Sequence, residues 1–403
     1  MVIAVLGSAG CDSTDEPIVP VTVVCDTARD RFDPGAVRGL SNAELAGLGR
    51  ARTGTSGRGT TRSTTHQRYV SAATGDDAAD GSEATPWRTL QHAADSVEPD
   101  TTVFVDASGD YAGGLVIANG GEPDGYVIFT ARDPASPPRV LGNSGETDVV
   151  RIEASYVVFQ GFEIAHHQRA SLDDDTIGIH VEPTNTDEIT HVEIRNNIVH
   201  DIGPGQIESE SCYYNGHGII AEAEGARISN IVIDGNELYD LFVGNSEVLV
   251  LNGNVEGFCV TANYIHDVDN IAIDIIGYEK NAEETTRNGV VADNVVLDAS
   301  NEWPYCTRGN CTYPAGDQSS DGIYVDGGAQ LEIAYNVVGR ADHGIELQSE
   351  NGQLIRDVEV HHNAVFNSYY KHLTLGPNER CSEHDNELFD DPSLADATRA
   401  SCQ

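Results

Sequence analysis

The stretch Ser246–Glu279, SEVLVLNGNVEGFCVTANYIHDVDNIAIDIIGYE, contains one structural unit twice. A short apolar run ends in Asn and Gly, an alternating run follows, and an Asn then introduces an apolar pair with a polar end. The same order of features begins again at Asp269. Strands this short, separated by Asn, Gly and Asp turns, cannot bury an apolar face alone and must stack on copies of themselves. The stretch therefore predicts a solenoid of short β-strands.

Seven segments between Val150 and the C-terminus can be laid on one another in this way. They are Gly178–Glu182, Gly218–Glu222, Val248–Asn252, Ala272–Ile276, Gly322–Asp326, Gly344–Gln348 and His372–Gly376. Partner strands between them are closed by Asn197, Asn236, Asn263, Asn294, Asn336 and Asn363. These asparagines are 39, 27, 31, 42 and 27 residues apart, so two coils carry long insertions. We expect the six side chains to stack inside the turns and to satisfy backbone groups there.

The start and end of this region carry a family signature. The sequence predicts a strand at Tyr69, a Pro86-Trp87 entry and a helix over Thr89–Val97. This opening resembles the N-terminal cap of pectate-lyase-like right-handed parallel β-helix proteins, and Asn386–Pro392, NELFDDP, resembles their closing segment. The resemblance implies an all-β fold over residues 69–403, a single-stranded right-handed parallel β-helix with a short N-terminal capping helix. Because this fold hosts lyases, hydrolases, epimerases and adhesins, it does not decide the chemistry.

The first 68 residues have a different character. Residues 1–11, MVIAVLGSAGC, resemble the end of a bacterial lipoprotein signal, in which the Cys receives a lipid. The resemblance implies a secreted or cell-surface protein with a lipid on Cys11 as its membrane anchor. Residues 12–68 are rich in Pro, Thr, Gly and Arg, which predicts a solvated, disordered tether with one helical turn near Ala43–Gly49.

Net charge limits the partners. The chain carries 23 Lys and Arg against 65 Asp and Glu, a formal charge of −42. The first 70 residues hold 8 basic and 7 acidic residues, which leaves 15 against 58 for the remainder. Such a body disfavours nucleic acid and anionic membranes as partners. Solubility in a salty or calcium-rich medium explains the acidity equally well.

Cysteine positions suit an oxidising exterior. Cys306 and Cys311 are close enough to clip a loop, and Cys381 with Cys402 can tie down the C-terminal tail. We expect Cys259, inside an apolar strand, to be a buried thiol.

The aligned segments gather ionisable residues on one face, because stacked coils place equivalent residues about 4.8 Å apart. The members of this group are Glu247, Asp274, Asp321, Asp326, Glu346, His217, Tyr324 and His343. A solvated acidic surface is the alternative interpretation. Asp274, however, lies within the apolar run IAIDIIG, and crowded carboxylates repel each other unless they share a proton or a cation.

Two cleavage reactions fit this group on a polysaccharide substrate. The resemblance favours calcium-assisted β-elimination of a uronate polysaccharide, with Lys280 as the base. The residues themselves favour a two-carboxylate glycoside hydrolase, because strand geometry places Asp274, Asp326 and Glu346 about 8–10 Å apart, which suits inversion. The candidate catalytic residues are Asp274, Asp326, Glu346, Lys280, Tyr324, His217 and His343. The candidate calcium ligands are Glu247, Asp274, Glu279 and Asp321.

Aromatic residues of the insertion Ala299–Ser320 complete the predicted site, because aromatic faces stack on sugar rings. The candidate substrate-binding residues are Trp303, Tyr305, Tyr313, Tyr278 and Glu350. A third hypothesis is a non-catalytic carbohydrate-binding or adhesin scaffold, which needs the aromatic residues and none of the carboxylates. The pairs His361-His362 and His166-His167 lack ligand spacing, so we expect no metal there. A monomer is expected.

Overall fold

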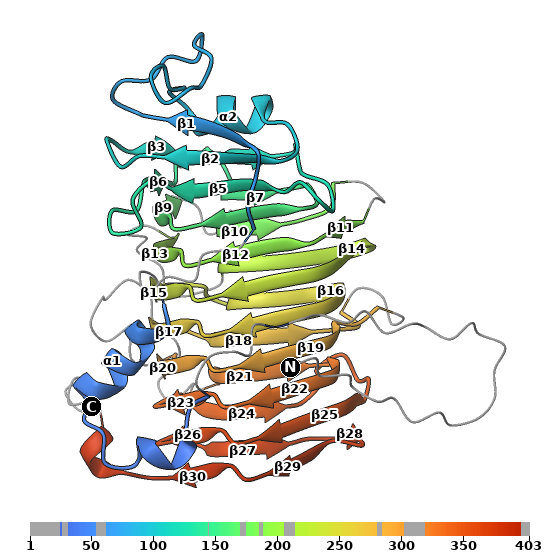
Figure 1. Cartoon of the computed structure of the whole chain (residues 1–403). Helices are drawn as coiled ribbons and strands as arrows, with labels where there is room; N and C mark the ends of the chain where they lie inside the picture. The colour runs from blue at the N-terminus through green and yellow to red at the C-terminus, as the bar shows by residue number, and fades with distance from the viewer. Residues whose placement is uncertain are drawn as a thin grey trace, which may run out of the picture.

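The computed structural model describes residues 25, 31–53, 62–143, 145–169, 175–184, 188–204, 214–279, 284–301 and 319–395. Its strands stack as coils along one axis, from the blue N-terminal end to the red C-terminal end (Figure 1). Every pairing between the named strands is parallel, for example β18 with β21 and β17 with β20. The prediction of a right-handed parallel β-helix, as in pectate-lyase-like proteins, is confirmed.

Each coil of the described chain contributes strands to three faces. The first face consists of β4 (Leu115–Ile117), β7 (Asp148–Ile152), β10 (Thr176–Val181), β14 (Gly216–Asp234), β16 (Glu247–Thr261), β18 (Ile271–Ile276), β21 (Asp321–Asp326), β24 (His343–Leu347) and β27 (Lys371–Leu375). The second face consists of β1 (His66–Val70), β2 (Thr101–Val105), β5 (Val127–Ala131), β8 (Val157–Gln160), β11 (Ile189–Thr190), β12 (Val192–Arg195), the later parts of β14 and β16, β19 (Arg287–Ala292), β22 (Ala329–Ala334), β25 (Ile355–His361), β28 (Asn378–Glu379) and β29 (Ser382–His384). The third face consists of β3 (Tyr111–Ala112), β6 (Arg139–Leu141), β9 (Glu163–Arg169), β13 (Ile198–Pro204), β15 (Glu237–Leu241), β17 (Tyr264–Val268), β20 (Val295–Ala299), β23 (Val337–Gly339), β26 (Ala364–Phe366) and β30 (Glu387–Phe389).

The register of the first face follows the alignment of the seven sequence segments. Its inward position reads Ile179, Ile219, Leu249, Ile273, Ile323, Ile345 and Leu373 in consecutive paired strands. The first six of these side chains are at most 1% exposed. Burying each contributes about 1.5–3 kcal/mol relative to leaving it in water. A slip by one residue would turn this whole column outward, so the apolar column holds the register.

An asparagine ladder runs inside the turns, as predicted. Asn263 is fully buried, and its Nδ2 donates to the backbone oxygen of Ile233 and to Oδ1 of Asn294, both at 3.0 Å. The same two bonds recur at the other predicted positions, and Asn386 extends the ladder beyond them. Each coil therefore closes its turn with an amide that also binds the next coil.

The two ends of the described β-helix have different covers. Helix α2 (Leu90–Ser96), capped by the Thr89 side chain, lies at the first coil and confirms the predicted capping helix. At the other end, Asp391 caps the short 3-10 helix η3 (Pro392–Leu394).

The N-terminal segment is not a solvated tether in its described part, which corrects our expectation. A 3-10 helix η1 (Pro34–Val37) and helix α1 (Asn42–Arg52) lie along the C-terminal half of the β-helix (Figure 1). Val37 and Leu45 are fully buried in a cluster with Tyr264 of β17 and Val295 of β20. Among the described residues, no helix has the length and apolar character needed to cross a bilayer.

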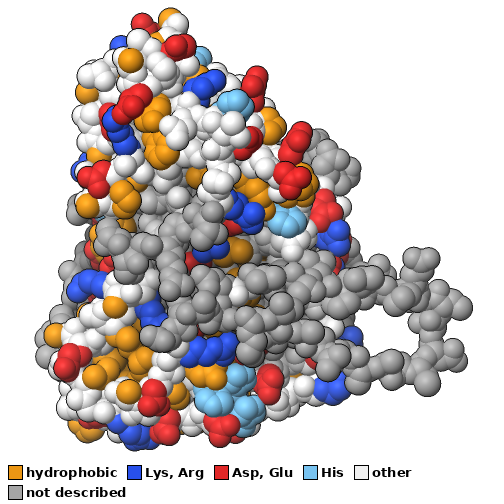
Figure 2. Space-filling view, in the orientation of Figure 1, with side chains coloured by type: hydrophobic (Ala, Val, Ile, Leu, Met, Phe, Trp, Pro, Cys, Tyr) orange, Lys and Arg blue, Asp and Glu red, His pale blue; other side chains and the backbone are white. Residues whose placement is uncertain are grey.

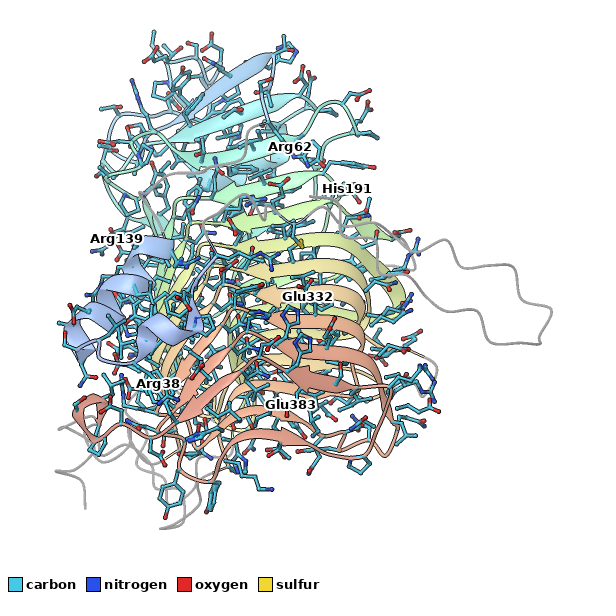
Figure 3. The ribbon with its side chains drawn as sticks, turned by 60° about the horizontal axis from the view of Figure 1, so that its bottom comes forward. Arg38, Arg62, Arg139, His191, Glu332 and Glu383 are labelled. Atoms are coloured by element: carbon cyan, nitrogen blue, oxygen red, sulfur yellow. A yellow bond between two sulfur atoms is a disulfide. The ribbon has the colours of Figure 1, made fainter. Side chains whose placement is uncertain are left out.

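Covalent and ionic contacts also attach this segment. Cys25 and Cys259 form a disulfide, so the prediction that Cys259 is a free buried thiol was wrong. Arg38, which is labelled in Figure 3, pairs with Glu387 of the last coil at 3.1 Å. Spacing in the sequence could not indicate either contact, because the partners are 234 and 349 residues apart. The predicted partner of Cys381, Cys402, lies outside the described residues, as do Cys306, Cys311 and Cys11.

Candidate active site

A polar pocket of about 500 Å³ opens on the first face, over β16, β18, β21 and β24. Its walls combine carboxylates with amides, one histidine and one tyrosine. The lining residues are Asn245, Glu247, Asn270, Ile271, Asp274, Ile276, Glu279, Ser319, Asp321, Tyr324, Asp326, His343, Glu346, Gln348, Glu350 and Asn351. Most of the predicted site residues within the described chain therefore lie in one cavity.

The register places three of these residues in one row. Asp274 of β18 pairs with Tyr324 of β21, and Tyr324 pairs with Glu346 of β24. The phenol thus separates the two carboxyls, whose Cα atoms are about 9–10 Å apart from strand spacing. The neighbour of Asp274 on the other side is Val250. Asp274 is therefore flanked by one apolar residue and one phenol.

Asp274 is the most buried carboxyl of the pocket, at 2% exposure. Its Oδ1 has no hydrogen-bond partner among the described residues. Burial, followed by repulsion from Glu247 and Asp326, raises the pKa of Asp274 well above the ordinary range of an aspartate. These surroundings therefore favour the protonated form of Asp274.

Glu247 and His217 meet at one end of the pocket. Nδ1 of His217 donates to the backbone oxygen of Glu247 at 2.9 Å and lies 3.7 Å from its carboxylate Oε2. Burial lowers the pKa of His217 to about 4, so the ring is neutral at pH 7. Burial and the charge of Glu279 raise the pKa of Glu247. His217 does not line the pocket, and its bond to β16 joins consecutive coils; its predicted catalytic role stays a prediction.

Asp326 has a different environment from Asp274. Its carboxylate accepts hydrogen bonds from the backbone N–H of Glu350 at 2.6 Å and from Nδ2 of Asn351 at 3.1 Å. Burial raises the pKa of Asp326 to about 6, and the bond from Glu350 opposes that rise. Burial thus raises the pKa of both aspartates, and at Asp326 the hydrogen bond from Glu350 limits the rise to about 6.

A third group lies at the beginning of the next two strands. Asp321 pairs in register with His343, and Nδ1 of His343 is 2.9 Å from Oε2 of Glu346. Ligating atoms of all three residues lie within 4.8 Å of one another. Burial and the charge of Glu346 raise the pKa of Asp321 well above the ordinary range.

Some of the remaining predicted residues are described by the structure, and the others lie outside the described chain. Tyr278 is half-buried just outside the pocket lining, so the structure does not support its predicted role in substrate binding. Glu279 lines the pocket and accepts a 2.6 Å hydrogen bond from Nδ2 of Asn252. The other predictions fall on residues outside the described part of the chain, namely Lys280, Trp303, Tyr305 and Tyr313.

Several amides and one serine of the pocket were missed by sequence reasoning: Asn245, Asn270, Ser319 and Asn351. Asn270 donates to the backbone oxygen of Ser246 at 2.7 Å and so joins consecutive coils. These residues stand in turns rather than in strands, where the column alignment gives no register. The one signal that could have found them is their position two or three residues before or after an aligned segment.

All Asp, Glu, Lys and Arg residues in the described lining of the pocket are acidic. Among the described residues that line the pocket there is neither Lys nor Arg, whereas Glu247, Glu279, Asp321, Asp326, Glu346 and Glu350 are acidic. Charges elsewhere on the visible surface are mixed, with Lys and Arg side chains beside Asp and Glu (Figure 2). The pocket therefore differs from the visible surface in lacking basic side chains among its described lining residues.

The sequence was compared with protein-family models and with known proteins. No protein-family model matches the sequence. The chain is 33% identical over 316 residues to the uncharacterized protein YwoF of Bacillus subtilis strain 168, a match that covers 76% of this chain and 64% of YwoF. The chain therefore spans less than two thirds of the length of this relative.

Solved structures share the architecture. The native GH136 lacto-N-biosidase from Eubacterium ramulus aligns with a TM-score of 0.54 and 13% identity over 80% of this chain and 68% of that enzyme. Its selenomethionine derivative gives a TM-score of 0.50 over the same shares. At this identity the likeness shows a common fold, the parallel β-helix, and nothing further.

Proposed function

We propose that this protein is a glycoside hydrolase in which Asp274 is the general acid and Asp326 the general base. The observation that carries the proposal is the contrast between these two carboxyls on adjacent coils of one pocket. Asp274 is almost fully buried and has an oxygen without a partner, whereas the carboxylate of Asp326 accepts hydrogen bonds from two N–H donors. Environments that push two carboxyl pKa values apart are what acid and base roles require.

The spacing suits an inverting reaction. Asp274 and Asp326 lie on neighbouring strands and two residues apart along them, so their Cα atoms are about 8 Å apart. Inverting enzymes leave about 6.5–9.5 Å between their carboxyls, which is room for a water molecule. Asp274 would protonate the leaving oxygen while Asp326 takes a proton from the attacking water. Tyr324, beside Asp274 in register, lies where it can donate to a hydroxyl of the sugar.

The pocket favours a substrate without carboxylates. A uronate would meet only like charges among the described lining residues. β-Elimination requires a cation or Arg to neutralise the uronate carboxylate and a base to remove the α-proton. The calcium-assisted lyase that we expected stays a prediction, since Lys280 lies outside the described residues.

The four residues that we assigned to calcium all line the pocket, although their ligating atoms do not form one group within 4.8 Å, and a calcium site there stays a prediction. Of Glu247, Asp274, Glu279 and Asp321, the described structure groups only Asp321 with two further ligating residues. We therefore derive no step of the reaction through calcium.

A panel of neutral and acidic polysaccharides, with calcium and with chelator, would test the proposal. New reducing ends and the ultraviolet absorbance of an unsaturated uronate are followed in parallel. We expect reducing ends without absorbance from a neutral glycan, and their loss in Asp274→Asn and Asp326→Asn. Asp124→Asn, an exposed aspartate of another turn, is the control and should retain activity. Absorbance that disappears with chelator would establish the lyase instead, and no cleavage in any sample would favour the binding scaffold.

A further inference from the structure

We propose that Asp321, His343 and Glu346 form a binding site for a divalent transition-metal ion at the edge of the pocket. The proposal goes beyond the hydrolysis described above, which assigns no role to these three residues. It rests on their geometry, on a buried oxygen without a partner, and on the chemistry of the donor set.

The backbone holds the three side chains together. Register pairing fixes Asp321 of β21 against His343 of β24, and Glu346 follows three residues later on the same strand. The three ligating atoms lie within 4.8 Å of one another, close to the separation of at most about 4.4 Å that one ion at about 2.0–2.2 Å from each atom allows. The ring of His343 also packs against Tyr370, with centroids 5.0 Å apart, which restricts its orientation.

Asp342 supports this arrangement from behind. Its carboxylate accepts hydrogen bonds from Oγ of Ser300 at 2.8 Å and from the backbone N–H of Asn301 at 3.2 Å. It also accepts from the backbone N–H of Ser320, the residue before Asp321. The starts of β21 and β24 are thus joined by a buried carboxylate, so the ligating side chains project from a rigid base.

Two buried atoms in the group lack the partners that burial demands. Asp321 is 5% exposed, and its Oδ1 has no hydrogen-bond partner among the described residues. Nδ1 of His343 is close to Glu346 but is not aligned for a hydrogen bond with it. An unsatisfied buried polar group costs about 1–3 kcal/mol, and a metal ion would satisfy both atoms at once.

The alternative is a single proton shared between Asp321 and Glu346. A proton would relieve the repulsion between these two carboxyls, but it would leave Nδ1 of His343 without a partner. It would also not use the imidazole, which points its nitrogen at the same space as both carboxyls. A cation accounts for all three groups, and no Lys or Arg among the described lining residues supplies one.

The donor set indicates the class of metal. One imidazole nitrogen and two carboxylates suit Zn²⁺ or Mn²⁺, whereas Ca²⁺ prefers six to eight oxygen ligands. Three protein ligands leave a coordination position open, and all three residues line the pocket. The free position would therefore be available to water or to a sugar hydroxyl.

A second histidine group serves as an internal comparison. Histidine side chains gather near the C-terminal end of the visible face (Figure 2), and His362, His384 and Asp385 have ligating atoms within 4.8 Å of one another. We expected no metal at His362. Its neighbours are already paired, since Nδ1 of His384 lies 2.9 Å from Asp385 and Nε2 lies 2.9 Å from Glu359. This exposed group is therefore the weaker candidate.

Metal binding by the intact chain tests the proposal without any substrate. The protein is stripped with chelator, dialysed against Zn²⁺, and its bound metal is counted; Mn²⁺ and Ca²⁺ are compared by calorimetry. We expect one Zn²⁺ per chain, held more tightly than Ca²⁺. Asp321→Asn and His343→Gln should each weaken Zn²⁺ binding by at least about 100-fold. Thermal unfolding of each variant checks that it is folded.

His384→Gln is the matched control, because it removes a histidine from the other group and should leave Zn²⁺ affinity unchanged. Bound Co²⁺ gives a second readout, since its visible spectrum should change when His343 is removed and not when His384 is. The proposal is overturned if the stripped wild-type chain takes up no Zn²⁺, or if the affinity falls in His384→Gln while Asp321→Asn and His343→Gln match the wild type. Loss of hydrolysis with intact Zn²⁺ binding would contradict only the proposed function.

Discussion

The carboxylate of Asp326 accepts a 2.6 Å hydrogen bond from the backbone N–H of Glu350, in the turn that follows the next strand of the first face. Asn351 of the same turn donates a second bond at 3.1 Å. The turn after β24 thus orients a carboxylate that belongs to β21. Both bonds favour the charged form, whereas Oδ1 of Asp274 on β18 has no hydrogen-bond partner among the described residues.

This contrast predicts a bell-shaped pH profile for kcat/KM. Asp326 must be ionised to act as a base, and burial raises its pKa to about 6, so activity should rise as the pH passes 6. Asp274 must be protonated, and because burial raises its pKa well above the ordinary range, the falling limb should lie at higher pH. Initial rates between pH 4 and 9 would measure both limbs. A rise centred near pH 4, as for an exposed aspartate, would contradict the assignment of Asp326.

Replacing Asp274 by Asn should stabilise the protein at alkaline pH. The pKa of Asp274 is raised in the folded state, so the folded chain binds more protons than the unfolded chain above about pH 4. The free energy of unfolding therefore loses this contribution progressively as the pH rises. Asp274→Asn does not titrate, and its advantage over the wild type should grow from near zero at pH 4 to on the order of 1 kcal/mol or more at pH 8.

Urea unfolding of the wild type and Asp274→Asn at pH 4, 6 and 8 would measure this difference. Glu383→Gln changes an exposed carboxyl of the C-terminal end, labelled in Figure 3, and should show no such pH-dependent gain. If Asp274→Asn were less stable than the wild type at pH 8, its carboxylate would have a stabilising partner that contradicts the role of a buried acid.

The asparagine ladder predicts a large stability loss at Asn263. Asn263→Ala removes the two bonds from its Nδ2 and the two that its Oδ1 accepts from Asn236, all at 3.0 Å and all buried. At about 1 kcal/mol for each bond, the expected loss in the free energy of unfolding is about 3 kcal/mol or more. Chemical denaturation would measure it. Asn119→Ala, at an exposed asparagine that donates to two carbonyls, should cost about 1 kcal/mol or less, and equal losses at both sites would argue against the ladder.

The disulfide predicts a redox-dependent attachment of the N-terminal segment. It joins Cys25 to β16, and helix α1 ends at Arg52, whose Nη1 is 3.2 Å from Asp293. Removing a disulfide costs about 2–4 kcal/mol, so Cys25→Ser should increase cleavage by trypsin after Arg50 and Arg52 at least about tenfold. Cleavage can be followed by mass spectrometry under oxidising conditions. The control is Cys381→Ser, a substitution on the last coils, and trypsin should cleave this variant at the wild-type rate. An unchanged cleavage rate in Cys25→Ser would show that packing alone holds the N-terminal segment.

Much of the β-helix could be predicted from the residues themselves. The run IAIDIIG alternates between the core and the pocket, and Ile273 and Asp274 occupy the register positions that the aligned segments imply. Asn263 and its counterparts stack as expected, because a buried amide in a repeated turn can be satisfied only by the next coil. Such local repeats determine their own neighbours, since a slip of one residue would expose an apolar column.

The candidate site was predictable only in part. Glu247, Asp274, Asp326 and Glu346 are on aligned strands, so their gathering on one face followed from the repeat. The contacts of Asp326 with Glu350 and Asn351 could not be predicted, because the length and path of a turn are independent of the strand register. Tyr278 and His217 are not among the pocket-lining residues for a related reason: position in a column says which face a residue is on, and not whether it reaches the cavity.

The sequence by itself therefore determined the repeat, the register and the acidic face, because alternation and stacked asparagines are local rules that each coil obeys with its neighbour. Only the tertiary structure decided the rest. The bond between Cys25 and Cys259, the packing of Leu45 on the third face, and the contact of Asp326 with Glu350 depend on how the chain returns to itself. No local pattern contains that information, since distant contacts are fixed by the geometry of the whole stack of coils and the burial it makes possible.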